Sequence, residues 1–166
     1  MKNDAAGSYA YDAFIKDQLE QELAKKGSIE QRGLFVITTA GTLVTALFGL
    51  VALTSGKKGF VPPTSASGNL RVALVLLVLA AIAAILTNAP LLYSEADPTD
   101  LQDAVDNLWT DSSAEATRMT SATRIAFIRQ AQRMNSIKAW LLITAVSLEV
   151  GAVAFVGLAM SRILEP

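Results

Sequence analysis

The chain has 166 residues, of which 52% are hydrophobic and only 17% are charged, and its formal net charge is −1. Soluble domains carry about 25% charged residues, so this composition excludes a disordered or collagen-like chain and argues against an ordinary soluble enzyme. The net charge provides no basic field, so we expect no nucleic-acid partner. The sequence contains no Cys and no His, which removes disulfides, cysteine nucleophiles, imidazole bases and Cys/His metal sites.

Residues 1–33 are predicted to form a charged helix that leads toward a membrane. Four apolar side chains recur at every fourth residue and share one face of it: Tyr11, Ile15, Leu19 and Leu23. Two interpretations of this face stay open, namely a coiled-coil or docking surface for a partner, and packing against the chain's own segment 94–138. Gly27 is expected to interrupt the helix. A capping box formed by Ser28 and Gln31 is expected to begin a new helix that enters the membrane.

Three windows carry almost all of the apolar excess: 34–53, 72–92 and 139–160. Each has the length of a membrane span, because a hydrocarbon core of ~30 Å needs about 20 helical residues. We therefore expect an all-α integral membrane protein with three transmembrane helices and additional cytoplasmic amphipathic helices. The windows divide the chain into a cytoplasmic helix (1–33), two spans (34–93) with an extracytoplasmic loop (54–71), a cytoplasmic helical segment (94–138), and a third span with a short C-terminus (139–166).

The segment 94–138 begins with a typical helix start, in which Asp97 caps the helix and Pro98 occupies its first position. One face of this helix is apolar and is a second candidate interaction surface: Leu101, Val105, Leu108 and Trp109. Another face carries three aspartates: Asp100, Asp103 and Asp106. The string lacks the pattern of a calcium loop, so we interpret it as a solvated acidic face and expect no metal site.

A further capping box, Ser112 with Glu115, precedes a proline-free run that extends to Leu164. This run predicts one helix of about 45–50 residues, cytoplasmic in its first half and membrane-spanning in its second. Two kinds of partner suit the basic residues of the first half: anionic lipid headgroups, and the acidic 97–115 helix, which we favour as the nearest opposite charge. These residues are Arg118, Arg124, Arg129, Arg133 and Lys138.

Glu149 is the most distinctive residue, because it falls near the centre of the third window. A carboxylate at that depth costs about 2.5 kcal/mol or more on insertion scales, and no Lys, Arg or His lies in any window to neutralise it. We favour a protonated carboxyl group that is hydrogen-bonded to hydroxyls of the first span. A role in an ion or proton pathway, and a shifted end of the span, are the alternatives. The candidate partners at the same depth are Thr38, Thr42 and Thr45.

Small residues at helical spacing predict where the spans approach one another closely. The predicted packing seam comprises Gly41, Gly49, Ala145 and Ala152, and further small residues share a face of the second and third windows: Ala73, Ala80, Ala84 and Ala159. Three spans can hardly enclose a wide aqueous path alone. Any path across the membrane therefore requires a homo-oligomer.

Lys and Arg are divided unevenly between the two sides that three spans define. The side with the N-terminus and 94–138 holds ten of them and the other side holds four, which together make the 14 in the chain. The positive-inside rule therefore predicts a cytoplasmic N-terminus. We expect a multi-pass protein of the bacterial inner (plasma) membrane, with membrane lipids among its partners.

Two short stretches lead into the first and the last span: EQRG at Glu30–Gly33 and RMNSIKA at Arg133–Ala139. In this layout the chain resembles the small membrane effectors associated with bacterial nucleotide second-messenger immunity, the SLATT and Pycsar transmembrane families. It also resembles uncharacterised actinobacterial membrane proteins of the same length. The resemblance implies oligomerisation and disruption of the membrane once a cytoplasmic protein or nucleotide signals. It supplies no ligand-binding residue, because no nucleotide-site motif matches.

Enzyme signatures are missing from the sequence: there is no phosphate loop, dinucleotide fingerprint, zinc-protease motif or nucleophile elbow. We therefore expect no catalytic residue, no cofactor and no enzymatic activity. The function we favour is an oligomeric inner-membrane effector that perturbs the membrane or forms a pore, in antiviral (antiphage) defence. The alternative is a non-conducting scaffold or anchor that docks a cytoplasmic partner through the two apolar faces described above.

The orientation is testable with single cysteines in a chain that has none of its own. With the N-terminus in the cytoplasm, an impermeant thiol reagent added to intact cells should label Ser65→Cys and spare Ser113→Cys. Labelling of Ser113→Cys without Ser65→Cys would reverse the topology.

Overall fold

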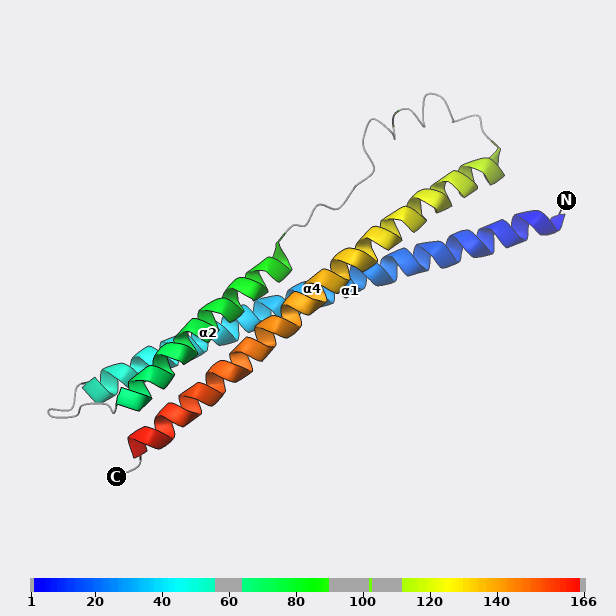
Figure 1. The fold of residues 1–166 in the computed structure, drawn as a ribbon. Helices are drawn as coiled ribbons and strands as arrows, with labels where there is room; N and C mark the ends of the chain where they lie inside the picture. Colours follow the sequence, from blue (N-terminus) through cyan, green and yellow to red (C-terminus); the bar gives the residue numbers. More distant parts are fainter. Residues whose placement is uncertain (1, 56–63, 90–101, 103–111, 165–166) are drawn as a thin grey trace. The chain divides into compact units, whose positions relative to one another are not determined.

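A computed structural model of the chain describes residues 2–55, 64–89, 102 and 112–164 (Figure 1). Within these ranges the structure is all-helical, with three long helices: α1 (Lys2–Ser55), α2 (Thr64–Asn88) and α4 (Ser113–Leu164). Each of the three contains a stretch long and apolar enough to cross a membrane. The fold is therefore compatible with a multi-pass membrane protein.

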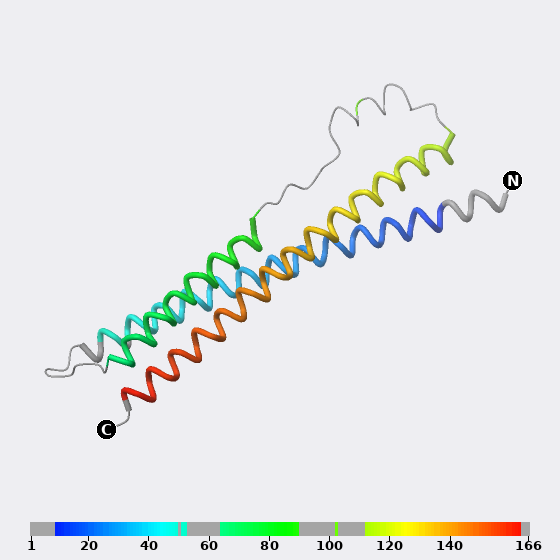
Figure 2. Tube along the Cα trace, in the orientation of Figure 1, coloured from blue at the N-terminus to red at the C-terminus, as the bar shows by residue number. Residues whose placement is uncertain are grey.

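The chain divides into two compact units, and both α1 and α4 contribute one part to each. Unit 1 contains residues 1–28 and 90–137, and unit 2 contains residues 29–89 and 138–166. Figure 2 shows the path of the chain through unit 2, where the second part of α1, all of α2 and the second part of α4 lie side by side. Unit 2 thus holds the first and third predicted spans in full and the second as far as residue 89.

Buried residues in unit 2 follow a spacing of three and four residues along each helix, which is the heptad spacing of helices that pack side by side. On α1 the inward positions are Gly33, Val36, Ala40, Leu43 and Leu47. On α2 they are Ala66, Leu70, Ala73, Leu77, Ala80, Ala84 and Thr87. On α4 the fully buried alanines are Ala145, Ala152 and Ala159, each with 0% of its surface exposed, and Lys138 is buried to the same extent. Small side chains at these positions let the backbones approach closely.

Within each unit, α1 and α4 run in the same direction. In unit 1, Asp12 contacts Ser121 and Glu22 contacts Asn135, so the residue numbers on the two helices increase together. In unit 2, Ala40 and Leu47 of α1 share one apolar cluster with Ala73 and Leu77 of α2 and Ala152 of α4. α2 runs in the opposite direction to α1 and α4. The three helices therefore alternate in direction along the chain, as three successive spans require.

Two predictions about the ends of the long helices have different outcomes. The helix from Ser113 to Leu164 is continuous, as predicted, and the Ser112 hydroxyl accepts a hydrogen bond from the Glu115 backbone N–H at 3.3 Å, as an N-cap does. The predicted break at Gly27 is wrong, because α1 continues through it. A single glycine costs a helix about 1 kcal/mol, and the packed residues on both sides of Gly27 outweigh that penalty. The predicted helix from Asp97 with its apolar face lies outside the described residues.

Gly33 of α1 lies close to α2. A Cβ atom placed on Gly33 would lie 2.6 Å from Nδ2 of Asn88, and 3.4 Å from both the Ala84 carbonyl oxygen and Cβ of Thr87. Thr87 is fully buried, and its hydroxyl donates to the Ala83 carbonyl at 3.0 Å. Gly33 therefore permits a contact that a larger residue would push apart.

The two glycines of α1 that flank Glu30 should respond in opposite ways to substitution. Gly27→Ala adds a Cβ that meets no described atom within 4 Å, so it should stabilise the helix by about 1 kcal/mol. Gly33→Leu should destabilise unit 2 by about 1–3 kcal/mol through overpacking against α2. Thermal unfolding followed by circular dichroism in detergent compares the two variants with the wild type. Equal melting temperatures for Gly33→Leu and the wild type would contradict this close approach.

Candidate functional site

Polar side chains occupy the inward face of unit 1, where α1 meets α4. The positions that face α4 are spaced by three and four residues: Asp12, Ile15, Leu19, Glu22 and Lys26. Opposite them on α4 lie Ser121, Arg124, Ile128, Ala131 and Asn135. Asp12 accepts hydrogen bonds from the Ser121 hydroxyl at 2.9 Å and from the Arg124 guanidinium. These two bonds lower the pKa of Asp12 below its ordinary value of 3.8.

Glu22 and Asn135 form the second polar layer of unit 1, and both are buried. The Asn135 amide donates to the Glu22 carboxylate at 3.0 Å and to the Glu22 backbone carbonyl at 2.9 Å. Lys25 also donates to Glu22 at 2.7 Å, and this bond, with smaller help from Asn135, lowers the pKa of Glu22 below 4.5 despite burial. Polar residues at inward heptad positions fix the register of paired helices at some cost in stability.

The basic residues of α4 find their acidic partners mainly on α1. Arg124 pairs with Asp12 in unit 1, and Lys138, whose side chain is fully buried, pairs with Glu30 in unit 2. The acidic 97–115 helix that we favoured as the partner of the basic residues lies mostly outside the described residues, so that pairing stays a prediction. Arg118 does pair with Glu115 of that segment, at 2.6 Å and one turn away on the same helix. Arg129 and Arg133 are exposed.

The apolar face predicted near the N-terminus is only partly turned toward α4. Ile15 and Leu19 are half-buried in the seam, whereas Tyr11 and Leu23 are 74% and 49% exposed. The predicted stripe advances four residues at a time and so drifts off the heptad seam, which advances by three and four. Leu101, Val105, Leu108 and Trp109 lie outside the described residues.

A face of small and polar residues on α1 points away from the seam of unit 2. Thr38, Gly41, Thr42, Thr45 and Gly49 are all exposed. Thr42 lies two residues, or about 200° of helical rotation, from the buried Ala40. A Cβ on Gly41 or Gly49 would meet no described atom within 4 Å, in contrast to Gly33. Of the predicted packing seam, the structure therefore buries Ala145 and Ala152 and leaves Gly41 and Gly49 open.

Each threonine hydroxyl on this face already donates a hydrogen bond within its own helix. Thr38 donates to the Leu34 carbonyl at 3.0 Å, Thr42 to Thr38 at 2.9 Å and Thr45 to Gly41 at 2.9 Å. Their single hydroxyl protons are therefore committed, and only oxygen lone pairs remain to accept further bonds. Thr38, Gly41, Thr42, Thr45 and Ala46 line a shallow groove.

Glu149 lies in a second groove, between α1 and α4 of unit 2, which shares Thr42 with the first and has a volume of about 480 Å³. Of the three threonines predicted as its partners, the structure places Thr42 on this groove and Thr38 and Thr45 elsewhere. Oε1 of Glu149 is buried and has no hydrogen-bond partner among the described residues. The remaining walls are Phe35, Thr39, Leu43, Val150 and Val153. The sequence reasoning missed Phe35 and Thr39, although their spacing from Thr42 places all three on one face of a helix.

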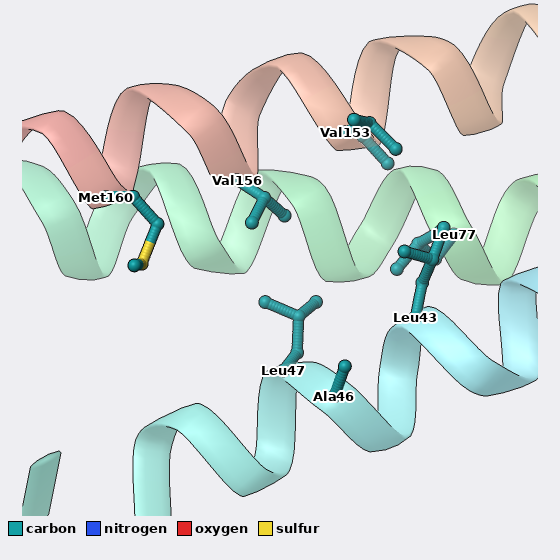
Figure 3. Close-up of a pocket in the computed structure, with 8 residues that line it drawn as sticks. Leu43, Ala46, Leu47, Leu77, Val153, Val156 and Met160 are labelled. Atoms are coloured by element: carbon teal, nitrogen blue, oxygen red, sulfur yellow. The ribbon is translucent and has the colours of Figure 1, made fainter. Parts of the chain in front are cut away.

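An apolar pocket of about 260 Å³ adjoins this groove and shares Leu43 and Val153 with it. Figure 3 shows Leu47 of α1 projecting toward Val156 of α4, with Met160 at one end of the pocket and Leu43, Leu77 and Val153 at the other. The walls are Leu43, Ala46, Leu47, Leu77, Ala152, Val153, Val156 and Met160. In the part of the chain that the structure describes, no group of three acidic side chains gathers that could hold a metal ion.

The lowered pKa values of Asp12 and Glu22 predict that unit 1 weakens in acid. Each carboxylate contributes stability above its ordinary pKa, and that contribution is lost as the pH falls through the lower pKa of the folded state. Circular dichroism between pH 7 and pH 2 should therefore show helix loss beginning below about pH 4.5, near the ordinary pKa of Glu. Asp12→Asn should make the loss shallower because it removes one titrating group. An unchanged acid transition in Asp12→Asn would contradict the Asp12–Arg124 contribution.

No family model, no curated protein and no solved structure matches the chain. We therefore infer the function from the arrangement of polar groups on the three helices.

Proposed function

We propose that the chain is a homo-oligomeric protein of the bacterial inner membrane that acts as a pore-type, membrane-perturbing effector without enzymatic activity. The single observation that carries this proposal is the open threonine–glycine face of α1, formed by Thr38, Gly41, Thr42, Thr45 and Gly49. Three helices have the length and composition to span a membrane, as such an effector requires. In this proposal the N-terminus and the segment 94–138 lie in the cytoplasm.

The threonine–glycine face has the properties of a helix–helix contact in lipid. Small residues let a second helix approach closely, and association in lipid is driven by such packing rather than by a hydrophobic difference. In the part of the chain that the structure describes, no atom of another helix lies within 4 Å of a Cβ placed on either glycine of this face. A second copy that packs there gains close contacts and covers hydroxyl groups that lipid cannot solvate. A ring of copies joined in this way gathers the α1 helices around a common axis, which a pore requires.

In this proposal the signal that activates the protein acts on its cytoplasmic part. The resemblance of Glu30–Gly33 and Arg133–Ala139 to the SLATT and Pycsar membrane effectors supports a defence role and a signal from a protein or a nucleotide. The polar layers of unit 1 also support a cytoplasmic signal. Asp12 and Glu22 fix the register of α1 against α4, and a signal on the cytoplasmic side would act by altering that register.

The test places a larger side chain on the open threonine–glycine face and, as a control, on another exposed face. Gly41→Leu and Gly49→Leu should leave monomer folding intact, because no described atom lies within 4 Å of either Cβ, but should shrink the oligomer. Ala154→Leu, at an exposed position of α4, is the control. Oligomer size is measured by light scattering in detergent, and membrane leakage by entry of a DNA-binding dye into induced bacteria.

We expect the glycine variants to lose both assembly and leakage while Ala154→Leu keeps both. Glycine variants that assemble as the wild type does would contradict the proposed interface. A wild-type oligomer that leaves the membrane sealed would contradict the pore.

The second candidate function is a non-conducting scaffold, and exposed aromatic residues near the N-terminus favour it. Tyr9, Tyr11 and Phe14 are 68%, 74% and 62% exposed on the part of α1 that belongs to unit 1. Aromatic residues are enriched at protein interfaces because they combine large apolar area with few rotatable bonds. A sealed membrane together with assembly intact is the outcome that favours this function over the pore.

A further inference from the structure

Glu149 is an intramembrane carboxyl group for which the chain supplies no counter-charge. The windows 34–53, 72–92 and 139–160 contain no Lys, Arg or His, so neither this copy nor a second copy brings a cation to that depth. An ionisable side chain within a span is a functional candidate by default, because its insertion is costly. Its position on α4 continues the heptad seam between Ala145 and Ala152, yet the seam leaves Oε1 without a hydrogen-bond partner among the described residues.

The hydroxyl groups near Glu149 do not satisfy it either. Thr42 donates to the Thr38 carbonyl at 2.9 Å, and Thr39 donates to the carbonyls of Phe35 and Val36 at 3.0 and 3.1 Å. Both hydroxyls line the groove of Glu149 but have already committed their protons within α1. The buried oxygen can therefore accept a positive or donating group that the described residues do not supply.

The walls around Glu149 indicate the kind of molecule that carries this group. Apart from Thr39, Thr42 and Glu149 itself, the groove is apolar, and it includes the ring of Phe35, which is 70% exposed. An aromatic face attracts cations as well as apolar groups. The adjoining pocket in Figure 3 has only apolar walls and shares Leu43 and Val153 with the groove. A volume of about 480 Å³ is within the range of small-molecule sites.

We propose that this groove binds a lipophilic organic cation, with its positive charge at Glu149 and its apolar body against Phe35 and the adjoining pocket. Charge complementarity selects the sign of the ligand, and the apolar walls select its surface. A metal ion fits less well, because hard cations require several oxygen ligands and the groove offers one carboxylate. The site is defined within a single chain, so it goes beyond the proposed pore and does not depend on assembly.

The test measures binding of tetraphenylphosphonium to the purified wild-type protein in detergent micelles by equilibrium dialysis. Triphenylphosphine oxide, an aromatic and uncharged compound, controls for partition into the micelle. We expect saturable binding of the phosphonium cation and only unsaturable partition of the oxide. Glu149→Gln keeps the shape of the side chain and removes the charge, so it should weaken binding of the cation by about tenfold or more.

A second pair of variants keeps the test decisive if Glu149→Gln folds poorly. Val153→Trp fills the boundary between groove and pocket from a position that is 49% exposed, so it should block binding without burying new bulk in the core. Val146→Trp is the matched control, because Val146 is 42% exposed on the same helix and lines neither space.

Loss of binding in Val153→Trp and retention in Val146→Trp support the site. The proposal is overturned if the wild type shows no saturable binding, if the neutral oxide binds as well as the cation, or if a folded Glu149→Gln binds as tightly as the wild type.

Discussion

The close approach of three helices along small residues is the constraint on which unit 2 depends. Ala73, Ala80, Ala84, Ala145 and Ala152 are all fully buried, and none of them has a side chain longer than a methyl group. Such positions contribute little apolar area each but let the helix backbones approach closely, and larger buried side chains such as Leu47 and Leu77 pack beside them. Other large apolar residues face outward, as in Val75, Ile82, Ile85 and Ile143, which is the arrangement expected when lipid surrounds the bundle.

The same heptad spacing carries polar groups at a few positions, and these differ in how completely they are paired. Asp12 and Glu22 are matched across unit 1 by Arg124 and Asn135, and Glu30 is matched by Lys138 in unit 2. Removing one member of a buried pair such as Lys138–Glu30 costs several kcal/mol, about 3–5, because the other charge is left uncompensated. Glu149 occupies the same kind of position, but its buried Oε1 has no hydrogen-bond partner among the described residues. That contrast separates the pairs that fix the register from the acid for which we propose a ligand.

The sequence allowed the spans to be located, because twenty apolar residues without a charge have few alternatives to a long helix. It also allowed the long uninterrupted helix after Ser112 and the small faces of the second and third windows to be predicted. The face of α1 was assigned less well. α1 carries two stripes of residues, one from Val36 to Leu47 and one from Thr38 to Gly49, and both have a spacing of three and four residues. Spacing alone therefore does not determine which of the two stripes packs inside the chain. The inward positions of unit 1 were missed because they are polar at Asp12 and Glu22, and a search for apolar periodicity passes over them.

The parallel pairing of α1 with α4 has a consequence for the order of events during synthesis. Glu30 and its partner Lys138 are 108 residues apart, and Asp12 and Arg124 are 112 apart. At about 5–20 residues per second, the ribosome needs roughly 5–20 s after completing Glu30 to produce Lys138. During that interval α1 and α2 can already form a hairpin through Gly33 and Thr87, but Asp12 and Glu30 do not yet have their partners on α4. These two carboxylates therefore stay without their cross-helix ion pairs until synthesis has passed Lys138.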